Sequence, residues 1–339
     1  MINDLKIAIY GAGSLGTILG AYITKNNVKV DLINRNKAHI DALKANGAKI
    51  VGTVNMNVKV NAIHIDELDQ NTKYDVIFLL TKQQDNKNVA IFLKDFISDN
   101  GVLVTLQNGL PEYLLQEVLG EEKVLGCTVN WGATLKEPGV CELTSTPDKL
   151  TFSLGSFTEK NKDKIPVVKE ILELMGPTEI DENFIGTRWS KLLVNSAFSG
   201  MSTVLGVNFG EVAKNKKSRK YAQALIKECI DICKAQNIKL EPIQGKDVAK
   251  LMDYKTKFKK KLAFMIIPIA IKKHRLIKAS MLQDIEKGKK CEIEAINGVI
   301  AKKGKEVGVE TPVNNKVIEI VKKIENGELK PSWDNLNLF

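Results

Sequence analysis

The chain has 339 residues, of which 44% are hydrophobic and 27% charged, with 24 glycines and 9 prolines. This apolar content is enough for packed cores and excludes a disordered or low-complexity chain. Fifty lysines and arginines against forty aspartates and glutamates give a formal net charge of +10. The basic residues are scattered apart from two clusters, residues 255–261 and 272–275, and aromatic residues make up only 6%, so nucleic-acid binding is not expected.

The first half of the chain alternates short apolar runs with helical patterns. We expect strands at residues 5–10, 28–33, 74–80, 101–106 and 123–129. Helical spacing follows the first strand, and a second helix is expected at residues 37–46. Strands at 140–145 and 149–154 would extend the sheet antiparallel or form its edge. Near-continuous apolar strands separated by helices predict a parallel sheet covered on both faces.

In the second half, the strand signals stop after Pro177 and helical periods dominate. We expect helices at residues 188–204, 218–236, 245–261, 291–307 and 313–325. The change in pattern places a domain boundary near residues 176–183, which gives a cofactor domain of residues 1–178 and a helical domain of residues 179–339.

The longest apolar run, residues 262–271, contains Pro268 and is half of the ~20 residues that a membrane-crossing helix needs. We expect a buried helix of the second domain, with a membrane-surface position or a subunit interface as alternatives. The first residues lack the pattern of a secretory signal, so we expect a cytoplasmic protein.

The cysteines and histidines point away from metal and disulfide chemistry. Five cysteines form no Cys-x-x-Cys pair, and no His/Asp/Glu cluster has ligand spacing, so neither disulfides nor a metal site is expected. Cys229 and Cys233, one helical turn apart, are expected to be packing residues. The three histidines, His39, His64 and His274, fit no catalytic pattern.

A glycine-rich turn follows the first strand. It reads Gly11-Ala12-Gly13-Ser14-Leu15-Gly16. In a dinucleotide-binding turn, Gly11 makes the tight turn, Gly13 lets the backbone approach a pyrophosphate, and Gly16 lets the helix pack on the strand. The N–H groups and dipole of the following helix then hold the phosphates. We therefore expect a dinucleotide site here.

The end of the second strand decides between NAD and NADP. An acidic side chain there binds the ribose 2′-hydroxyl of NAD, whereas an arginine receives the 2′-phosphate of NADP. Asp31 has about the right separation from Gly11, but the strand continues beyond it, and Arg35 lies at the tip. We interpret Arg35 as the phosphate ligand, helped by Lys37, and expect NADP(H) as the cofactor.

Several further motifs occur in one order along the chain: Thr81-Lys82, Gln107-Asn108-Gly109, a tryptophan followed by Lys191-x-x-x-Asn195, Ser280-Met-Leu-Gln-Asp284, and a segment from Glu292 to Gly298. With the glycine turn and Arg35, they give a chain that resembles the ketopantoate reductase (2-dehydropantoate 2-reductase) family over nearly its whole length. The resemblance implies an α/β fold, namely a Rossmann domain followed by an all-α domain like the C-terminal domain of 6-phosphogluconate dehydrogenase. It also implies reduction of a 2-oxo acid by NADPH, most simply of ketopantoate to D-pantoate for pantothenate and coenzyme A synthesis.

The resemblance also implies roles for single residues. Lys82, Asn108 and Gly132 match cofactor contacts, and Asn108 also matches a substrate contact. Lys191 matches the catalytic lysine, and Glu292 an acid near the cofactor and the reacting centre. The substrate ligands are matched by Lys191, Asn195, Ser199 and Ser280.

The chemistry of the reaction agrees with these roles. Hydride transfer to a ketone builds negative charge on the carbonyl oxygen, which needs a donor and a proton source, and a lysine supplies both. Lys191, Asn195 and Ser199 are spaced at i, i+4 and i+8, so a single α-helix would present all three on one face.

Three positions depart from the family pattern. Ser199, Phe209 and Ile277 stand where the family usually has asparagines. A 2-oxo acid with a more apolar side chain therefore remains an alternative substrate, and an NADP-binding sensor without activity is a further alternative. As partners we expect the small-molecule substrate, no nucleic acid and no inserted membrane segment; a homodimer through the helical domain is left open.

Overall fold

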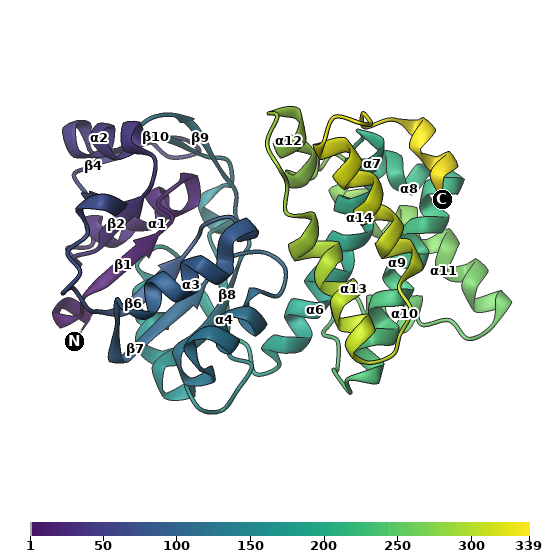
Figure 1. The fold of residues 1–339 in the computed structure, drawn as a ribbon, viewed down its shortest axis with the longest axis horizontal. Helices are drawn as coiled ribbons and strands as arrows, with labels where there is room; N and C mark the ends of the chain where they lie inside the picture. Colours follow the sequence, from purple (N-terminus) through teal and green to yellow (C-terminus); the bar gives the residue numbers. More distant parts are fainter. Residues whose placement is uncertain (1, 244) are drawn as a thin grey trace. The chain divides into compact units, whose positions relative to one another are not determined.

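The computed structural model describes residues 2–243 and 245–339. It divides into two compact units (Figure 1). The first contains the chain up to Gln107 and Pro111–Phe184, and the second contains Asn108–Leu110 and Ile185–Phe339. The division near the start of the helical region therefore falls after Phe184.

The first unit is built on an eight-stranded sheet. Its order is β12 (Thr178–Ile180), β11 (Phe152–Gly155), β8 (Val124–Val129), β7 (Ile97–Thr105), β6 (Tyr74–Leu79), β1 (Ile7–Tyr10), β2 (Asp31–Asn34) and β5 (Asn61–His64). The strands from β8 to β5 are parallel, and β11 pairs antiparallel with β8. The strand order reverses at β1, where binding crevices form in open parallel sheets.

Helices cover both faces of this sheet. Alternate residues of each strand point to opposite faces, so each strand contributes apolar side chains to two separate clusters. On β1, Ile7 and Ile9 join a buried cluster with α1 (Ser14–Lys25) and α5 (Ile165–Glu173). Ala8 and Tyr10 join a second cluster with α3 (Asn86–Lys94) and α4 (Pro111–Leu119). The expected parallel sheet, buried on both faces, is confirmed.

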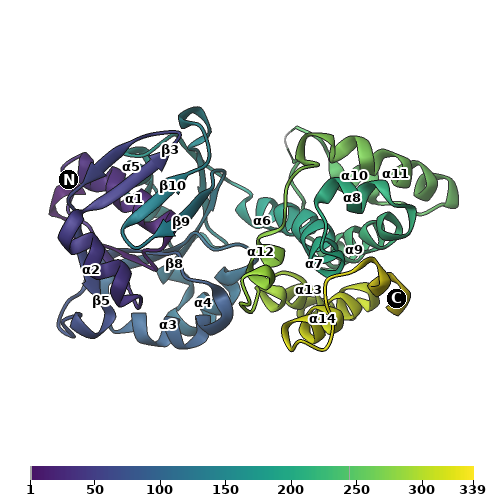
Figure 2. The same ribbon diagram turned by 90° about the horizontal axis from the view of Figure 1, so that it is seen from above.

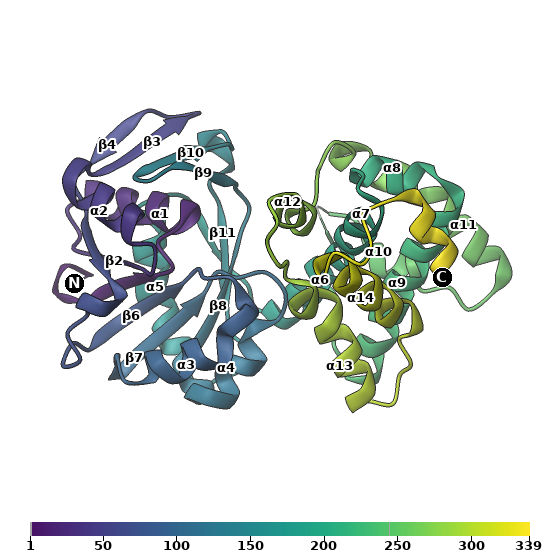
Figure 3. The same ribbon diagram turned by 45° about the horizontal axis from the view of Figure 1, so that its top comes forward.

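A second, four-stranded sheet packs against α1, which also packs against the first sheet (Figure 3). Its order is β4 (Met56–Val58), β3 (Ala48–Gly52), β10 (Val140–Leu143) and β9 (Ala133–Glu137). The sequence pattern predicted β10 and β11, but not that β10 belongs to a separate sheet. The helix expected at residues 37–46 is α2 (Lys37–Asn46), which starts at the Asn36 cap.

Among its described residues, the second unit is all-helical, apart from one isolated bridge between Ile243 and Lys246. Its helices are α6 (Phe184–Val194), α7 (Gly200–Leu205), α8 (Phe209–Lys214), α9 (Lys216–Ala235), α10 (Val248–Met252), α11 (Lys257–Ala270), α12 (Ser280–Glu286), α13 (Val299–Glu306) and α14 (Pro312–Glu325). Two π-helices, η7 (Asn195–Ser199) and η9 (Glu294–Gly298), run into α7 and α13. The 20-residue α9 packs against α8, α10, α11, α13 and α14 (Figure 2).

Besides the helix expected at residues 188–204, which is described with the candidate site, three expectations for the second half of the chain are wrong. A strand, β12, follows Pro177 and pairs with β11. The helix expected at 245–261 is two helices, because Asp247 and Thr256 each accept a hydrogen bond from the backbone N–H three residues later and start a separate helix.

The third correction concerns the apolar run at 262–271, which lies in α11 and the residue after it. This helix is not buried as a whole, since within it only Ala263 and Ile267 are buried, while Ile269 is 68% exposed. Among the described residues, none of the helices is both long and apolar enough to cross a membrane. All five cysteines are buried, as the packing role expected for Cys229 and Cys233 requires.

Candidate active site

The predicted cofactor residues of the first unit follow the carboxyl ends of parallel strands. Gly11 comes directly after β1, Arg35 directly after β2, and Lys82 three residues after β6. Gly132 comes three residues after β8 in the same unit, and Asn108, which is assigned to the second unit, comes three residues after β7. Since these strands are parallel neighbours, their ends share one edge of the sheet, where ligands of this sheet type bind.

The three glycines of the turn differ in their surroundings. Gly11 has φ +97°, and a Cβ there would lie 2.6 Å from the backbone nitrogen of Thr81. A Cβ at Gly16 would lie 2.8 Å from the carbonyl oxygen of Gly11 and 2.9 Å from Ile9, so helix and strand are in close contact. At Gly13 the nearest atom to a built Cβ is 3.9 Å away. The space beside Gly13 is therefore open, as a pyrophosphate would require.

The N–H groups of this turn divide into two sets. Those of Gly11 and Ala12 both donate to the carbonyl oxygen of Ile33, at 2.9 and 3.0 Å, and hold the turn on β2. Gly13 is the N-cap of α1, and no side chain caps this helix. The first-turn N–H groups, from Ser14 onward, have no acceptor within the helix, which is the arrangement that a phosphate-binding helix start requires.

The structure separates Asp31 from the turn. Asp31 is the first residue of β2 and lies at its amino end, where it accepts hydrogen bonds from Asn61 (2.6 Å) and the Tyr74 hydroxyl (2.7 Å). Burial and this hydrogen bond raise the pKa of Tyr74. Arg35 instead follows the carboxyl end of the strand, with a side chain 60% exposed and 3.8 Å from Asp85.

A buried pair of amides, which the sequence did not single out as a pair, fixes the loops after β6 and β7. Asn86 and Gln107 exchange two hydrogen bonds, at 3.0 and 2.8 Å. Gln107 also donates to the Thr81 carbonyl at 2.8 Å. The Thr81-Lys82 loop is thereby held to the residue that precedes Asn108. Amides paired across 21 positions leave no local pattern, so sequence reasoning could not find this pair.

Both backbone polar groups of Gly132 form hydrogen bonds within the first unit. Its N–H donates to Ser145 Oγ at 2.9 Å, and its carbonyl accepts from the Thr144 N–H at 3.0 Å. The backbone contact to the cofactor that the family resemblance implies for Gly132 therefore depends on the remaining lone pair of its carbonyl oxygen, or on a change in the Ser145 rotamer.

Lys191 and Asn195 lie on a partly exposed side of a helix in which most residues are buried. Arg188, Trp189 and Ser190 are buried, and so are the two leucines that follow Lys191. Lys191 and Asn195 are half-buried, four residues apart, and therefore on the same side of the helix. This arrangement can present an ammonium and an amide to one ligand.

The expectation of one uninterrupted helix from 188 to 204 is wrong, because the π-helix η7 begins at Asn195. A π turn has i→i+5 hydrogen bonds, so the α-helical spacing assumed for Ser199 does not apply. Ser199 is 8% exposed, and its carbonyl accepts from the Thr203 hydroxyl at 2.8 Å. Single π turns within helices are frequent at functional sites.

A buried amide joins the two π-helices. Asn297, in η9, donates from Nδ2 to the Ser196 carbonyl in η7 (3.2 Å) and to Asn314 Oδ1 (2.9 Å). Asn314 in turn donates to Glu228 (2.7 Å), whose carboxylate also accepts the N–H of Val313 at the start of α14. Burial raises the pKa of Glu228, and these hydrogen bonds oppose the rise. The register of the helix that carries Asn195 is thus fixed from three other elements.

The remaining candidates of the second unit lie on neighbouring elements. Glu292 is 8% exposed, and its carbonyl accepts the N–H groups of Ala295 and Ile296 as the chain enters η9. Ser280 is exposed and is the first residue of α12, which packs against η7 and α7. Ser280 therefore belongs to a helix beside the π-helix that contains Asn195.

Two of the three departures from the family pattern are adjacent in space. The N–H of Phe209 donates to the Ile277 carbonyl at 3.1 Å. Phe209 is 6% exposed, and its ring centroid lies 5.7 Å from that of Phe198, next to Ser199 in η7. Ile277 is 44% exposed. Phe209 is thus a core residue, whereas the Ile277 side chain is accessible.

His39 has a structural environment in the first unit. It is fully buried, with Nε2 3.0 Å from the Thr17 hydroxyl and Nδ1 accepting the Gly139 N–H at 3.0 Å. Burial lowers the pKa of His39. This histidine joins α1, α2 and the turn before β10. Among the described residues, no group of three or more His, Cys, Asp or Glu side chains could hold a metal ion.

Comparison with known proteins shows which family the chain belongs to. The family described as "Ketopantoate reductase PanE/ApbA" matches residues 7–156, and "Ketopantoate reductase PanE/ApbA C terminal" matches residues 183–325. The chain is 31% identical over 323 residues to a 2-dehydropantoate 2-reductase of Pyrococcus horikoshii, covering 95% of this chain and 98% of the relative. It is 30% identical over 325 residues to that of Archaeoglobus fulgidus, covering 95% and 98%.

A solved structure of D-mandelate dehydrogenase with NADH and anilino(oxo)acetate has the same fold. Its TM-score is 0.80 at 22% identity, covering 95% of this chain and 99% of that chain. The resemblance and the fold predicted from the sequence are confirmed: the chain belongs to the ketopantoate reductase family.

Proposed function

We propose that this chain reduces 2-dehydropantoate (ketopantoate) to D-pantoate with NADPH. The observation that carries the proposal is the pair Lys191 and Asn195, half-buried on one side of a helix whose neighbouring residues are buried. An ammonium and an amide in this setting suit a 2-oxo acid, whose carboxylate and carbonyl oxygen both accept hydrogen bonds. The names of the family and of the curated relatives support the same reaction.

NADPH fits the residues of the first unit. The open space at Gly13 and the uncapped first turn of α1 suit a pyrophosphate, and the exposed Arg35 suits a 2′-phosphate. Asp31, the acid that NAD would need, is at the other end of β2 and bonded to Asn61 and Tyr74. When bound, the reduced nicotinamide would supply a hydride to the carbonyl carbon of the substrate.

The proposed roles of the side chains come from the family resemblance, and the charge that develops during the reaction explains the role of Lys191. As the hydride adds to carbon, the carbonyl oxygen becomes negative, and the Lys191 ammonium stabilises that oxygen and then donates its proton to form the hydroxyl. Asn195 and Ser280 orient the substrate by hydrogen bonds, with Ser199 and Asn108 as further predicted contacts. Glu292, a buried acid, would hold the substrate or the cofactor near Lys191.

A second candidate substrate class rests on Ile277. Its exposed apolar side chain stands where the family usually offers an asparagine, which favours a 2-oxo acid without a side-chain hydroxyl. The similar structure of D-mandelate dehydrogenase supports the fold only, because it is 22% identical to this chain.

The test is NADPH oxidation by the purified protein with ketopantoate, 2-oxoisovalerate and phenylglyoxylate. Turnover of ketopantoate with the highest kcat/KM supports the proposal. A clear preference for either of the others supports the second candidate. No turnover with any 2-oxo acid, while NADPH still binds, would favour the cofactor-binding sensor. A cytoplasmic location and a homodimer through the helical unit remain predictions, which cell fractionation and sedimentation velocity would test.

A further inference from the structure

The positive charge of the chain is concentrated in one segment of the second unit. Residues 254–283 contain nine lysines and arginines and no aspartate or glutamate, whereas the whole chain has a formal net charge of +10. The other residues together therefore contribute a net charge of only +1. The candidate reaction uses none of these nine basic side chains.

The same segment exposes a continuous apolar stripe. Phe258, Leu262, Met265 and Ile269 are 78%, 44%, 51% and 68% exposed. Their spacing of four, three and four residues places them on one side of α11. Ala263 and Ile267, 1% exposed, lie on the other side, where α11 packs on α8 and α9 at the rim of the unit (Figure 1).

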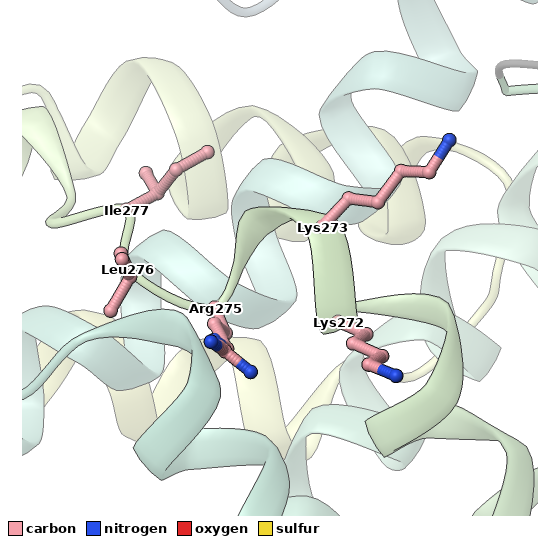
Figure 4. A pocket seen from close by; sticks show the side chains of 5 residues that line it. All are labelled: Lys272, Lys273, Arg275, Leu276 and Ile277. Carbon is pink, nitrogen blue, oxygen red and sulfur yellow. The ribbon is translucent and has the colours of Figure 1, made fainter.

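Basic side chains border this stripe. Lys259 and Lys261 are exposed and follow Phe258 on the first turns of α11. After the helix, a hollow of about 700 Å³ is lined by Lys272, Lys273, Arg275, Leu276 and Ile277 (Figure 4). In that view Lys272 and Arg275 extend to the same side, and Leu276 is 80% exposed. Basic side chains thus lie at the start of the apolar stripe and again after its end along the chain.

We propose that α11 and residues 272–276, together called the basic apolar surface, bind the surface of an anionic lipid bilayer. The apolar stripe enters the boundary between headgroups and acyl chains, and the lysines and Arg275 meet the phosphates, as in amphipathic helices that lie in a membrane interface. This is peripheral binding and needs no spanning helix.

The charge and the apolar side chains of this surface favour an anionic bilayer over a second copy of the chain and over a nucleic acid. A second copy of the chain would bring an equally positive surface against this one, and like charges in contact oppose association. A nucleic acid supplies phosphates, but its backbone offers no apolar layer for four large side chains. An anionic bilayer provides both negative charge and an apolar layer.

The experiment is co-sedimentation of the full chain with vesicles of phosphatidylcholine alone and with vesicles that contain about one-third phosphatidylglycerol. We expect at least ~10-fold stronger binding to the anionic vesicles, lost as salt rises from about 0.1 to about 0.5 M. The double variant Phe258→Ser/Ile269→Ser should bind ~10-fold more weakly, because both side chains leave the apolar layer. The variant Lys259→Glu/Lys261→Glu should also lose binding.

Matched controls lie on α3 of the first unit. Ile91 is 52% exposed, so Ile91→Ser changes a similar side chain, and Lys87→Glu/Lys94→Glu repeats the charge reversal. Both controls should bind vesicles like the unaltered chain. All variants alter exposed side chains outside the candidate active site, so unchanged circular dichroism and NADPH binding would show that they fold.

Three results would overturn the proposal. Equal binding to neutral and anionic vesicles is one, and an equal loss in the α3 controls is another. The third is a dimer in solution that Phe258→Ser/Ile269→Ser splits into monomers, which would assign the surface to a second copy. Since none of these measurements uses reductase activity, failure of the proposed reaction would leave them interpretable.

Discussion

The two units differ in what positions their candidate residues. In the first unit the positions follow from backbone geometry: strand ends, a turn at positive φ and the first turn of a helix place Gly11, Gly13 and Arg35. In the second unit the helix of Lys191 and Asn195 runs into a π turn that a buried amide from 101 positions away stabilises. A backbone-built site is encoded locally in the sequence, whereas a side-chain-built site depends on distant partners. Each prediction below tests one side of this difference.

Lys191→Ala should have the largest effect. Losing the proton donor and the oxyanion contact should lower kcat by ~10²–10⁴, while the affinity for NADPH, whose phosphate cradle is in the first unit, stays the same. Steady-state kinetics and a fluorescence titration with NADPH would measure both quantities. Lys220→Ala, at an exposed position of α9, is the control. Near-normal turnover of Lys191→Ala would show that another residue donates the proton, and Glu292 would be the next candidate.

Arg35→Ala should weaken NADPH binding by ~10–100-fold, because a hydrogen bond to a charged group is worth about 1.5–3 kcal/mol. NADH has no 2′-phosphate, so its affinity should not change. Lys37→Ala should have a smaller effect, since Lys37 lies two residues further, at the start of α2, with its ammonium 3.6 Å from the Asp41 carboxylate. Equal losses for NADPH and NADH in the Arg35 variant would contradict the assignment of the 2′-phosphate.

Asn297→Asp tests the long-range side of the comparison. The Asn297 amide uses Nδ2 in two hydrogen bonds, while its Oδ1 has no hydrogen-bond partner in the structure. An aspartate of the same shape loses both donors and leaves Ser196 and Asn314 unsatisfied, at about 1–3 kcal/mol for each group. We expect a lower melting temperature and a lower kcat, with NADPH affinity retained.

The isosteric change makes the result specific. A cavity cannot explain the loss, because asparagine and aspartate occupy the same volume. Ile91→Ser is a control for a general effect on stability, since it alters an exposed position of the other unit. Unchanged kcat in a stably folded Asn297→Asp would show that the π-helix does not need this amide.

The sequence predicted the first unit better than the second. The helix at 37–46, the parallel strands and the glycine turn all leave local patterns, and the structure has each of them. The two π-helices, the Asn86–Gln107 pair and the Asn297 network depend on residues 21 to 101 positions apart, which periodicity does not detect. The break before α11 had a local signal, because Thr256 is a residue type that starts helices. The helical spacing of the apolar residues on either side led to the prediction of one helix instead. The roles of Lys191 and Ser280 came from family resemblance.

His39 predicts a pH dependence of the stability of the first unit. Burial lowers its pKa in the folded state, whereas the unfolded chain binds a proton near pH 6.5. Stability is therefore full above about pH 6.5 and falls as the pH drops below it, by at most about 1.4 kcal/mol per pH unit for one proton. Chemical denaturation at pH 7.5 and 5.5 would measure this, and His39→Gln should reduce the dependence. A loss that persists undiminished in His39→Gln would assign it to other groups.

The smallest expected effect concerns substrate choice at Ile277. Ketopantoate has a side-chain hydroxyl that 2-oxoisovalerate lacks, and a net hydrogen bond is worth about 0.5–1.5 kcal/mol. If Ile277 contacts the substrate, Ile277→Asn should raise the ratio of kcat/KM for ketopantoate over 2-oxoisovalerate by ~2–10-fold. Because Ile277 is 44% exposed, the change should leave the fold intact, whereas Phe209, at 6%, packs on Phe198 and could not be exchanged so safely. Leu276→Asn, at the neighbouring and more exposed position, should leave the ratio unchanged. An unchanged ratio in Ile277→Asn would place this side chain outside the substrate site, so that apolar character here would carry no information about the natural 2-oxo acid.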